Sequence, residues 1–381
     1  MVVTQKRFRY KLKIYLRAAL LIIVLAFTIK DGLPDRSRRG RIHAAARPYE
    51  FNYIAWEVEA LWSKAKQSQW GYQSYVPEAE RKDAILKYIE LVGQLLDLHS
   101  QLEATYTTPS SDNANDLRRQ IADLEKRRAE LQPIVEPMIE SQVSKVLEEQ
   151  GFGVMGQIVP PVSFRFVETP DVLVVSPREV IRQDFAISLR PLDVDEAAQL
   201  EQQVETVSPN DAAYVTGTGG VGIWPAMVIE SRYPAYVFEI VAHEWSHHYL
   251  FMFPLGMEYL GLPETRIINE TTATVFGNAM ALLVLNRFYE QEVADGKIWV
   301  PDYPTLADYQ SAAVQPTTTT SEPIRDPDGP RPTTRGTIIN RTRITADYLL
   351  ALGRVDAAES YMESRRHWLG MRVLNQAWFA F

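Results

Sequence analysis

Two histidines and a glutamate stand at a spacing that can hold a metal ion on one face of a helix. His243 and His247 are four residues apart within residues 236–253, a run that contains no proline. Residues four apart share a helix face, so two imidazole nitrogens can reach one ion. Glu244 lies one position further round, where its carboxylate can take a proton from a water activated by the metal. The pattern predicts metal-dependent hydrolysis.

Surface histidines on an ordinary amphipathic helix are the alternative interpretation of this pattern. The residues on both sides, 237–241 and 249–253, are mostly apolar, which is typical of a buried helix. Imidazoles and carboxylates inside a buried helix need partners that offset their lost hydration. The sequence therefore favours a metal site.

Glu270 is the candidate for a third metal ligand. It follows His247 by 23 positions, with a turn expected over residues 254–263, and it opens an apolar helix predicted to run to about Tyr289. Catalytic zinc usually has three protein ligands and one open position. A returning helix that carries Glu270 would complete such a site.

The motif HEWSH, which begins at His243, is followed by the motif NETTA, which begins at Asn269. This pair of motifs resembles the gluzincins, the HExxH…E zinc metallopeptidases, which include thermolysin-like, aminopeptidase-like and membrane-anchored bacterial proteins. The resemblance covers residues 210–290 and implies a zincin-like domain that binds Zn²⁺ and cleaves peptide bonds. It also implies the site residues: metal ligands His243, His247 and Glu270, and general base Glu244.

The sequence departs from the family pattern in two ways. The gap between the two motifs is longer than in the best-known members. Thr274 stands where the family has an acidic residue that orients a ligand histidine. We therefore expect Asn278 or a backbone carbonyl to orient His243.

Composition places the chain among globular proteins. Its 381 residues are 46% hydrophobic and 23% charged, and this length allows two domains, or one large domain with an appended element. The net charge is −8 and the basic residues gather at the N-terminus, so no nucleic-acid surface is predicted. The chain has no cysteine, which excludes disulfides and thiolate metal ligands.

The N-terminus predicts a membrane anchor. Residues 1–17 form a basic tail without acidic side chains, and residues 18–29 are an unbroken apolar run. Including the preceding residues gives a marginal transmembrane segment at 14–30. A cleaved signal peptide is the alternative, but no small-residue cleavage site follows promptly. We expect a single-pass signal anchor in the cell membrane, with the tail in the cytoplasm and the catalytic domain outside.

Residues 47–151 predict helices, two of which form an antiparallel hairpin around a break at 107–113. Arg128 falls on the seam of this hairpin, and Pro133 and Pro137 are expected to bend its second helix. We favour a structural arm and keep a homo-oligomerising or partner-binding element as the alternative. Apolar residues recur at three- and four-residue spacing on both helices: Ile85, Ile89, Val92, Leu96, Leu117, Ile121, Leu124, Leu131, Val135 and Met138.

The remaining chain, 155–381, is predicted to be the zincin-like domain. A Pro/Thr/Asp-rich stretch at 313–336 cannot bury enough apolar surface to order itself, so a disordered loop is expected there. Strands are predicted at 162–167, 172–175, 185–189, 212–216 and 223–229, and helices at 193–207, 338–352 and 356–369. The strand at 223–229 is expected to be the edge that binds substrate backbone.

The glycine cluster at 217–222 formally matches the dinucleotide-binding pattern G-x-G-x-x-G. That motif requires a helix directly afterwards, whereas a β-type run follows here, so nucleotide binding is rejected. We predict instead a hairpin or flexible loop beside the metal cleft. Glu230, after this run, is interpreted as a solvated carboxylate, with contact to a substrate amine as the alternative.

Peptide hydrolysis also needs a donor for the developing oxyanion. Tyr361, Arg365, Arg366 and His367 are the candidates, although a solvated basic helix end explains them better. His248 points about 100° away from its ligand neighbour. We interpret it as a packed or supporting imidazole.

The sequence thus predicts an α+β protein: a mostly helical catalytic domain with a small mixed sheet, preceded by a helical hairpin and an N-terminal transmembrane anchor. The expected function is zinc-dependent hydrolysis of a peptide or protein substrate, without a choice between aminopeptidase and endopeptidase. The alternative is a non-catalytic envelope scaffold with a structural or vestigial metal site.

Overall fold

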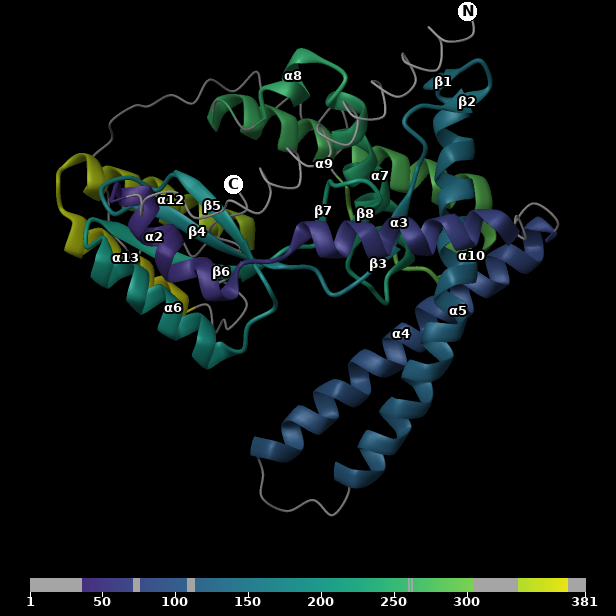
Figure 1. Ribbon diagram of the computed structural model, residues 1–381, viewed down its shortest axis with the longest axis horizontal. Helices are drawn as coiled ribbons and strands as arrows, with labels where there is room; N and C mark the ends of the chain where they lie inside the picture. The colour runs from purple at the N-terminus through teal and green to yellow at the C-terminus, as the bar shows by residue number, and fades with distance from the viewer. Residues whose placement is uncertain are drawn as a thin grey trace, which may run out of the picture.

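The computed structural model describes residues 36–70, 76–107, 114–259, 261, 263–303 and 335–368. It shows an α+β protein, mostly helical with three small sheets (Figure 1). The predicted tail and anchor lie outside the described residues, and so do residues 313–334 of the stretch predicted to be a disordered loop. Its last two residues, 335 and 336, begin a helix.

Helices α2 to α5 come before the first strand, α6 lies between β5 and β6, and α7 to α13 follow the last strand. The described helices are α2 Arg38–Ala46, η1 Arg47–Tyr49, α3 Tyr53–Trp70, α4 Glu78–Thr107, α5 Ala114–Glu149, α6 Val194–Val207, α7 Pro234–Leu250, α8 Pro254–Met257, α9 Pro263–Phe288, α10 Glu290–Ala294, α12 Arg335–Ala351 and α13 Val355–Trp368. The strands are β1 Gly153–Val154, β2 Gln157–Ile158, β3 Phe164–Phe166, β4 Asp171–Pro177, β5 Phe185–Leu189, β6 Asp211–Gly217, β7 Gly220–Val221 and β8 Ala226–Val228.

The main core lies between the hairpin helices and the helices α7 and α9. Buried residues of α4, α5, β3, β8, α7 and α9 form one apolar cluster, with Trp245, Tyr289 and Phe238 among its largest members. Its sheet has the order β3-β8-β7, in which β3 is parallel to β8 and β7 antiparallel. Strand β8 is therefore the middle strand, and the prediction that residues 223–229 form the substrate-binding edge is wrong.

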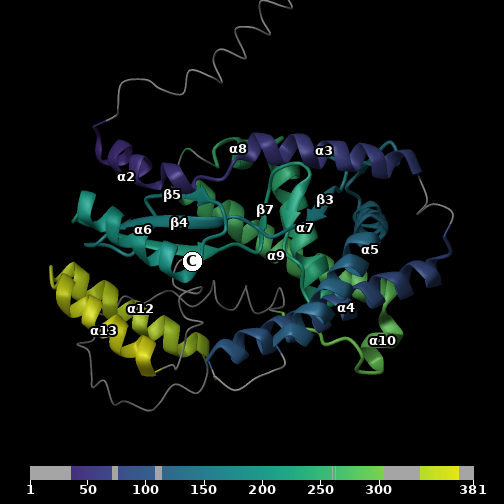
Figure 2. The same cartoon turned by 60° about the horizontal axis from the view of Figure 1, so that its bottom comes forward.

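A second, smaller core lies beside the first. It contains the antiparallel sheet β5-β4-β6, covered by α6 and α2 (Figure 2). Helix α6 starts at a capping box, in which the Glu196 backbone N–H donates to the Asp193 carboxylate and the Asp193 backbone N–H donates to the Glu196 carboxylate. Helices α12 and α13 pack against each other at this end of the molecule (Figures 1 and 2).

The predicted hairpin is present as α4 and α5, which pack along each other (Figure 1). Helix α5 continues without interruption past Pro133 and Pro137. Arg128, which falls on the seam of the predicted hairpin, donates to Glu230 at 2.8 Å, and Tyr88 of α4 donates to the same carboxylate. Glu230 is therefore not a solvated carboxylate: it ties the hairpin to the segment before α7.

One helix among the described residues, Glu264–Phe288, is long and apolar enough to span a membrane. Its buried face belongs to the main core, through Met280, Ala281, Val284 and Leu285.

Candidate metal centre

Helix α7 presents its two histidines because its other face is buried. Pro234 stands in the first turn, where a missing N–H costs nothing. Phe238, Val241 and Trp245 are almost fully buried in the main core, and the Trp245 indole N–H donates to the Pro160 carbonyl at 2.8 Å. Anchored in this way, the helix directs His243 and His247 together toward α9.

Helix α9 brings Glu270 to the two histidines, as the sequence predicted. The Oε2 atom of Glu270 lies 3.4 Å from His243 Nε2 and 3.5 Å from His247 Nε2. The two imidazole Nε2 atoms are 3.1 Å apart. Of the described residues, only these three form a cluster of His, Asp and Glu that could hold a metal ion.

These separations suit a small tetrahedral ion. Nitrogen and oxygen ligands about 2.0–2.2 Å from zinc, at tetrahedral angles, lie about 3.3–3.6 Å from one another. The observed 3.1–3.5 Å is close to this range. The three donor atoms fit a zinc ion without moving the helices that carry them.

Two further residues, which the sequence did not identify, orient the ligands. The buried side chain of Asn269 accepts a hydrogen bond from His247 Nδ1 at 2.7 Å, which leaves Nε2 free for a metal. The Tyr259 hydroxyl donates to Oε1 of Glu270. No hydrogen bond joins His243 to Asn278 among the described residues. The structure therefore does not show that Asn278 orients His243.

Burial and hydrogen bonds shift the pKa values of the two carboxyl groups of the site in opposite directions. Burial opposes the charge of Glu270, yet hydrogen bonds from His243 and His247 outweigh it and hold the pKa of this carboxyl below its ordinary value. Glu244 is only 4% exposed. Burial raises the pKa of Glu244 to about 7, against the opposing effect of the two histidines. A carboxylate with a pKa near neutrality is suited to general acid–base chemistry.

The glycine cluster at 217–222 packs closely against this carboxylate. A Cβ atom on Gly220 would lie 2.8 Å from Cδ of Glu244, and one on Gly222 would lie 3.1 Å from Cβ of His247. Only glycine allows the backbone to approach this closely. Within the cluster, residues 220 and 221 form the edge strand β7, which pairs antiparallel with β8 as in the predicted hairpin, and no nucleotide-binding helix follows.

The remaining candidates lie elsewhere. Helix α13, which carries Tyr361 and Arg365, packs against α12 at the end of the molecule opposite α7 and α9, so neither residue reaches the metal centre (Figures 1 and 2). The side chains of Arg366 and His367 lie outside the described residues. His248 is packed, as predicted, and donates from Nε2 to the Ile223 carbonyl at 2.8 Å.

Comparison of the chain with protein-family models, curated proteins and solved structures finds no match in any of the three.

Proposed function

We propose that this protein is a membrane-anchored zinc peptidase of the gluzincin type. One observation carries the proposal: His243, His247 and Glu270 converge from two helices, and the buried Glu244 lies beside them. A structural zinc site normally has four protein ligands, whereas three ligands and an open position are typical of a catalytic site.

The residues divide the work of hydrolysis. His243, His247 and Glu270 would hold the ion, and Tyr259 and Asn269 keep two of these ligands in position. When bound, zinc supplies a Lewis acid that polarises a carbonyl and makes a water more acidic. Glu244 takes the proton of the attacking water and returns it to the leaving amine.

A peptide substrate suits the shape of the site. Strand β7 is the edge of its sheet and lies against Glu244 and His247. An extended peptide that added to this edge would place its backbone beside the metal ligands. We propose further that the segment 14–30 anchors the chain in the cell membrane, with the catalytic domain outside the cytoplasm.

Metal content and peptide cleavage of the purified full chain test the proposal. We expect about one zinc per chain in the wild type, and loss of the ion in Glu270→Ala. Glu264→Ala, which removes an exposed carboxylate of the same helix, should keep the ion. Glu244→Gln should keep the zinc and lose cleavage of a peptide library, because the proton acceptor is gone.

The outcomes separate the proposal from its rivals. The same donors also bind Fe²⁺, Co²⁺ or Ni²⁺, so the identity of the bound metal decides the cofactor. A folded wild type without metal, or cleavage by Glu244→Gln at the wild-type rate, would overturn the peptidase and favour a non-catalytic scaffold.

A further inference from the structure

The outer face of α3 is apolar although it is exposed. Val58 and Trp62 are each 65% exposed. At 100° per residue, the six apolar residues of this face fall within an arc of about 120°. Glu59 is the one acidic residue on the exposed face, and it pairs with Arg165 at 3.5 Å. The six residues, named here the α3 stripe, are Ile54, Ala55, Val58, Leu61, Trp62 and Ala65.

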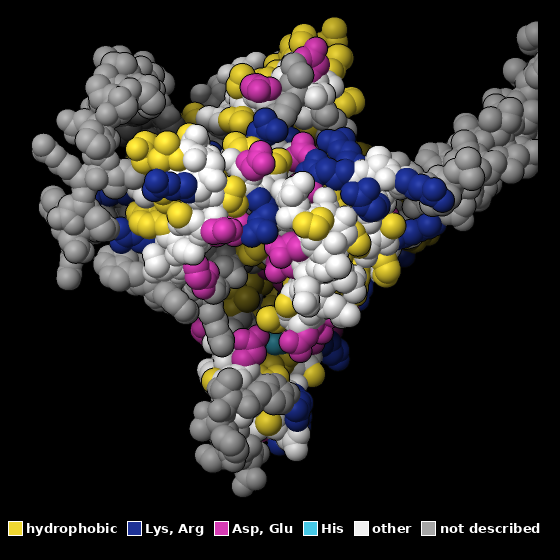
Figure 3. All heavy atoms as spheres, turned by 90° about the vertical axis from the view of Figure 1, so that its left-hand side faces the viewer, with side chains coloured by type: hydrophobic (Ala, Val, Ile, Leu, Met, Phe, Trp, Pro, Cys, Tyr) yellow, Lys and Arg dark blue, Asp and Glu magenta, His cyan; other side chains and the backbone are white. Residues whose placement is uncertain are grey.

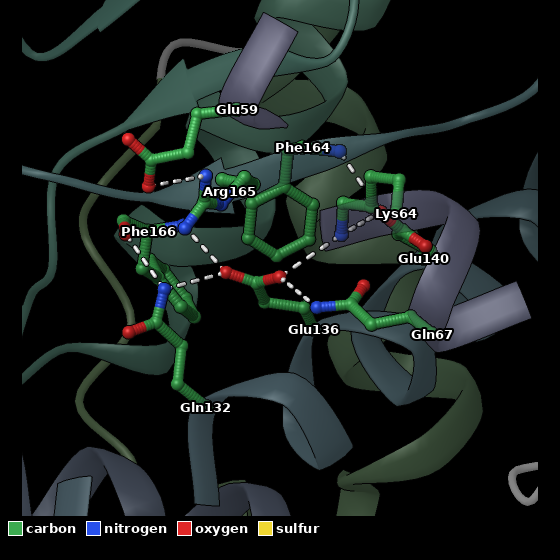
Figure 4. Close-up of polar contacts among 9 residues, drawn as sticks. All are labelled: Glu59, Lys64, Gln67, Gln132, Glu136, Glu140, Phe164, Arg165 and Phe166. Carbon is green, nitrogen blue, oxygen red and sulfur yellow. Dashed lines mark hydrogen bonds and ion pairs between the residues drawn. The ribbon is translucent and has the colours of Figure 1, made fainter. Parts of the chain in front are cut away.

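The inner face of the same helix combines the buried Ala60 and partly buried Trp56 with polar side chains that make hydrogen bonds to α5. Lys64 donates to Glu136 at 3.0 Å and to Glu140 at 2.8 Å, and Gln67 donates to Glu136 at 2.9 Å (Figure 4). Near the start of the helix, the Tyr53 hydroxyl donates to Ser188 at 2.7 Å. Buried hydrogen bonds and ion pairs therefore hold α3 on the protein.

This arrangement reverses the usual surface helix, whose apolar stripe faces the core and whose charged residues face water. The buried pairs of Lys64 fix which way α3 faces. Turning the stripe inward would break them and leave Glu136 buried without its cation. The stripe therefore stays outside and is available to an apolar environment beyond the protein.

A second apolar patch lies on the same side of the molecule. In Figure 2, α2, α3 and α8 all lie along the upper side, and α3 runs parallel to it. The chain around α8 exposes Phe251, Met252, Phe253 and Met257, and hydrophobic side chains gather over this end in Figure 3. Exposed patches of this kind mark contacts with proteins or membranes.

The chemistry around the stripe fits a lipid bilayer. Trp62 stacks with Lys66, whose ammonium lies 5.3 Å from the ring centroid, and both residue types are favoured at membrane interfaces. Arg36, Arg39 and Arg41 of the α2 region are exposed and suit anionic headgroups. Lysine and arginine side chains gather on the right-hand side of Figure 3.

Chain length supports the same partner. The predicted anchor ends at residue 30 and α2 begins at Arg38. Eight residues span at most about 29 Å, so the side of the molecule that carries α2 must stay close to the bilayer surface.

We propose that the side formed by α2, α3 and α8 rests on the membrane, with the α3 stripe inserted at the boundary between headgroups and acyl chains. This rests on the anchor in the proposed function but not on its metal chemistry.

A spin label on the α3 stripe tests the proposal. The chain has no cysteine, so Val58→Cys gives the full chain a single labelling site. The matched control is Ile344→Cys on α12, where the isoleucine is 61% exposed and the helix lies on the lower side of Figure 2, opposite α3. Both proteins are reconstituted in vesicles of phosphatidylcholine and phosphatidylglycerol, and collisions of the label with oxygen and with a water-soluble nickel chelate are compared.

The label at Val58 should lie about 5–10 Å inside the headgroup boundary, with oxygen collisions favoured, and the label at Ile344 should favour nickel. Ile54→Cys repeats the measurement one turn away and guards against a local defect. Equal nickel access at Val58 and Ile344 would overturn the proposal. Spin–spin broadening between Val58 labels would do so too, because it would make the stripe an interface between two copies. Neither readout depends on zinc or activity.

Discussion

At the scale of single residues, the position of Glu244 depends on a residue that has no side chain. The carboxylate is buried under strand β7, and Gly220 leaves the space that its oxygens occupy. The glycine therefore fixes the position of the proposed general base.

Gly220→Ala should lower cleavage while leaving the metal in place. The new Cβ would displace Glu244, the flexible end of a side chain, more readily than the strand or the helix. A misplacement of about 1 Å can cost on the order of 100-fold in rate. The checks are kcat and zinc content, measured in parallel.

Gly217→Ala is the matched control from the same cluster, because its Cβ would meet nothing closer than the Asp171 carboxylate at 3.6 Å. Equal kcat for the two variants would show that the close approach of Gly220 has no role in the reaction.

The sequence identified the three side chains that converge and the neighbouring Glu244, because each lies in a short motif or at a helical spacing. Asn269 and Tyr259 were not identified in their roles. Asn269 reaches His247 only because α9 returns beside α7, and Tyr259 depends on the turn between these helices. Long-range packing leaves no local pattern in a sequence.

At the scale of elements, α5 completes the free edge of β3. Glu136 accepts from the Phe166 backbone N–H, Glu140 from that of Phe164, each at 2.9 Å, and Gln132 donates to the Phe166 carbonyl at 2.7 Å (Figure 4). These side chains, spaced four apart on one helix face, stand in for a neighbouring strand. They satisfy an edge that would otherwise be open to pairing.

Glu136→Ala should destabilise the protein by about 3–5 kcal/mol, because it removes the carboxylate that Lys64 pairs with and orphans a buried backbone N–H. Denaturant unfolding measures the change. Glu148→Ala, on the same helix, removes a solvent-exposed pair with Lys145 and should cost less than about 1 kcal/mol. Similar losses for both variants would contradict this account.

The elements themselves were predicted well, since periodicity and capping are local: β5 and α6 lie within one residue of their predicted bounds. The pairing of the strands was not predicted correctly. Strand β8 lies in the middle of its sheet because β3, 62 residues earlier, pairs with it in parallel. That contact is fixed by packing on α5 and α7, which the strand sequence does not reveal.

At the scale of the whole molecule, α2 fastens the start of the described chain to the second core. Arg38 donates to both oxygens of Asp211, at 2.6 and 2.5 Å, and also to Asp184. Ser208 donates to Asp211 as well. Burial favours the neutral acid, but these hydrogen bonds outweigh it and lower the pKa of Asp211.

Asp211→Asn should reduce the free energy of unfolding at neutral pH by about 1–2 kcal/mol, a modest value because Arg38 is partly exposed. A lowered pKa in the folded state contributes stability that is present above the unfolded value of about 3.9 and is lost as pH falls through the folded value. Wild type and variant should therefore converge below about pH 4. Unfolding curves at several pH values check this.

Asp123→Asn, at an exposed pair with Arg127, serves as the control and should follow the wild type throughout. A difference between wild type and Asp211→Asn that stays constant into acid would contradict the role assigned to ionised Asp211.

The ion pair between α2 and the second core also imposes an order in time. Arg38 and Asp211 are 173 residues apart, and synthesis at about 5–20 residues per second makes the aspartate roughly 9–35 s after the arginine. Throughout that interval the arginine of α2 exists without the aspartate that pairs with it. Under the proposed anchoring, the first surface that this segment meets during biogenesis is the lipid, and the protein is assembled onto it afterwards.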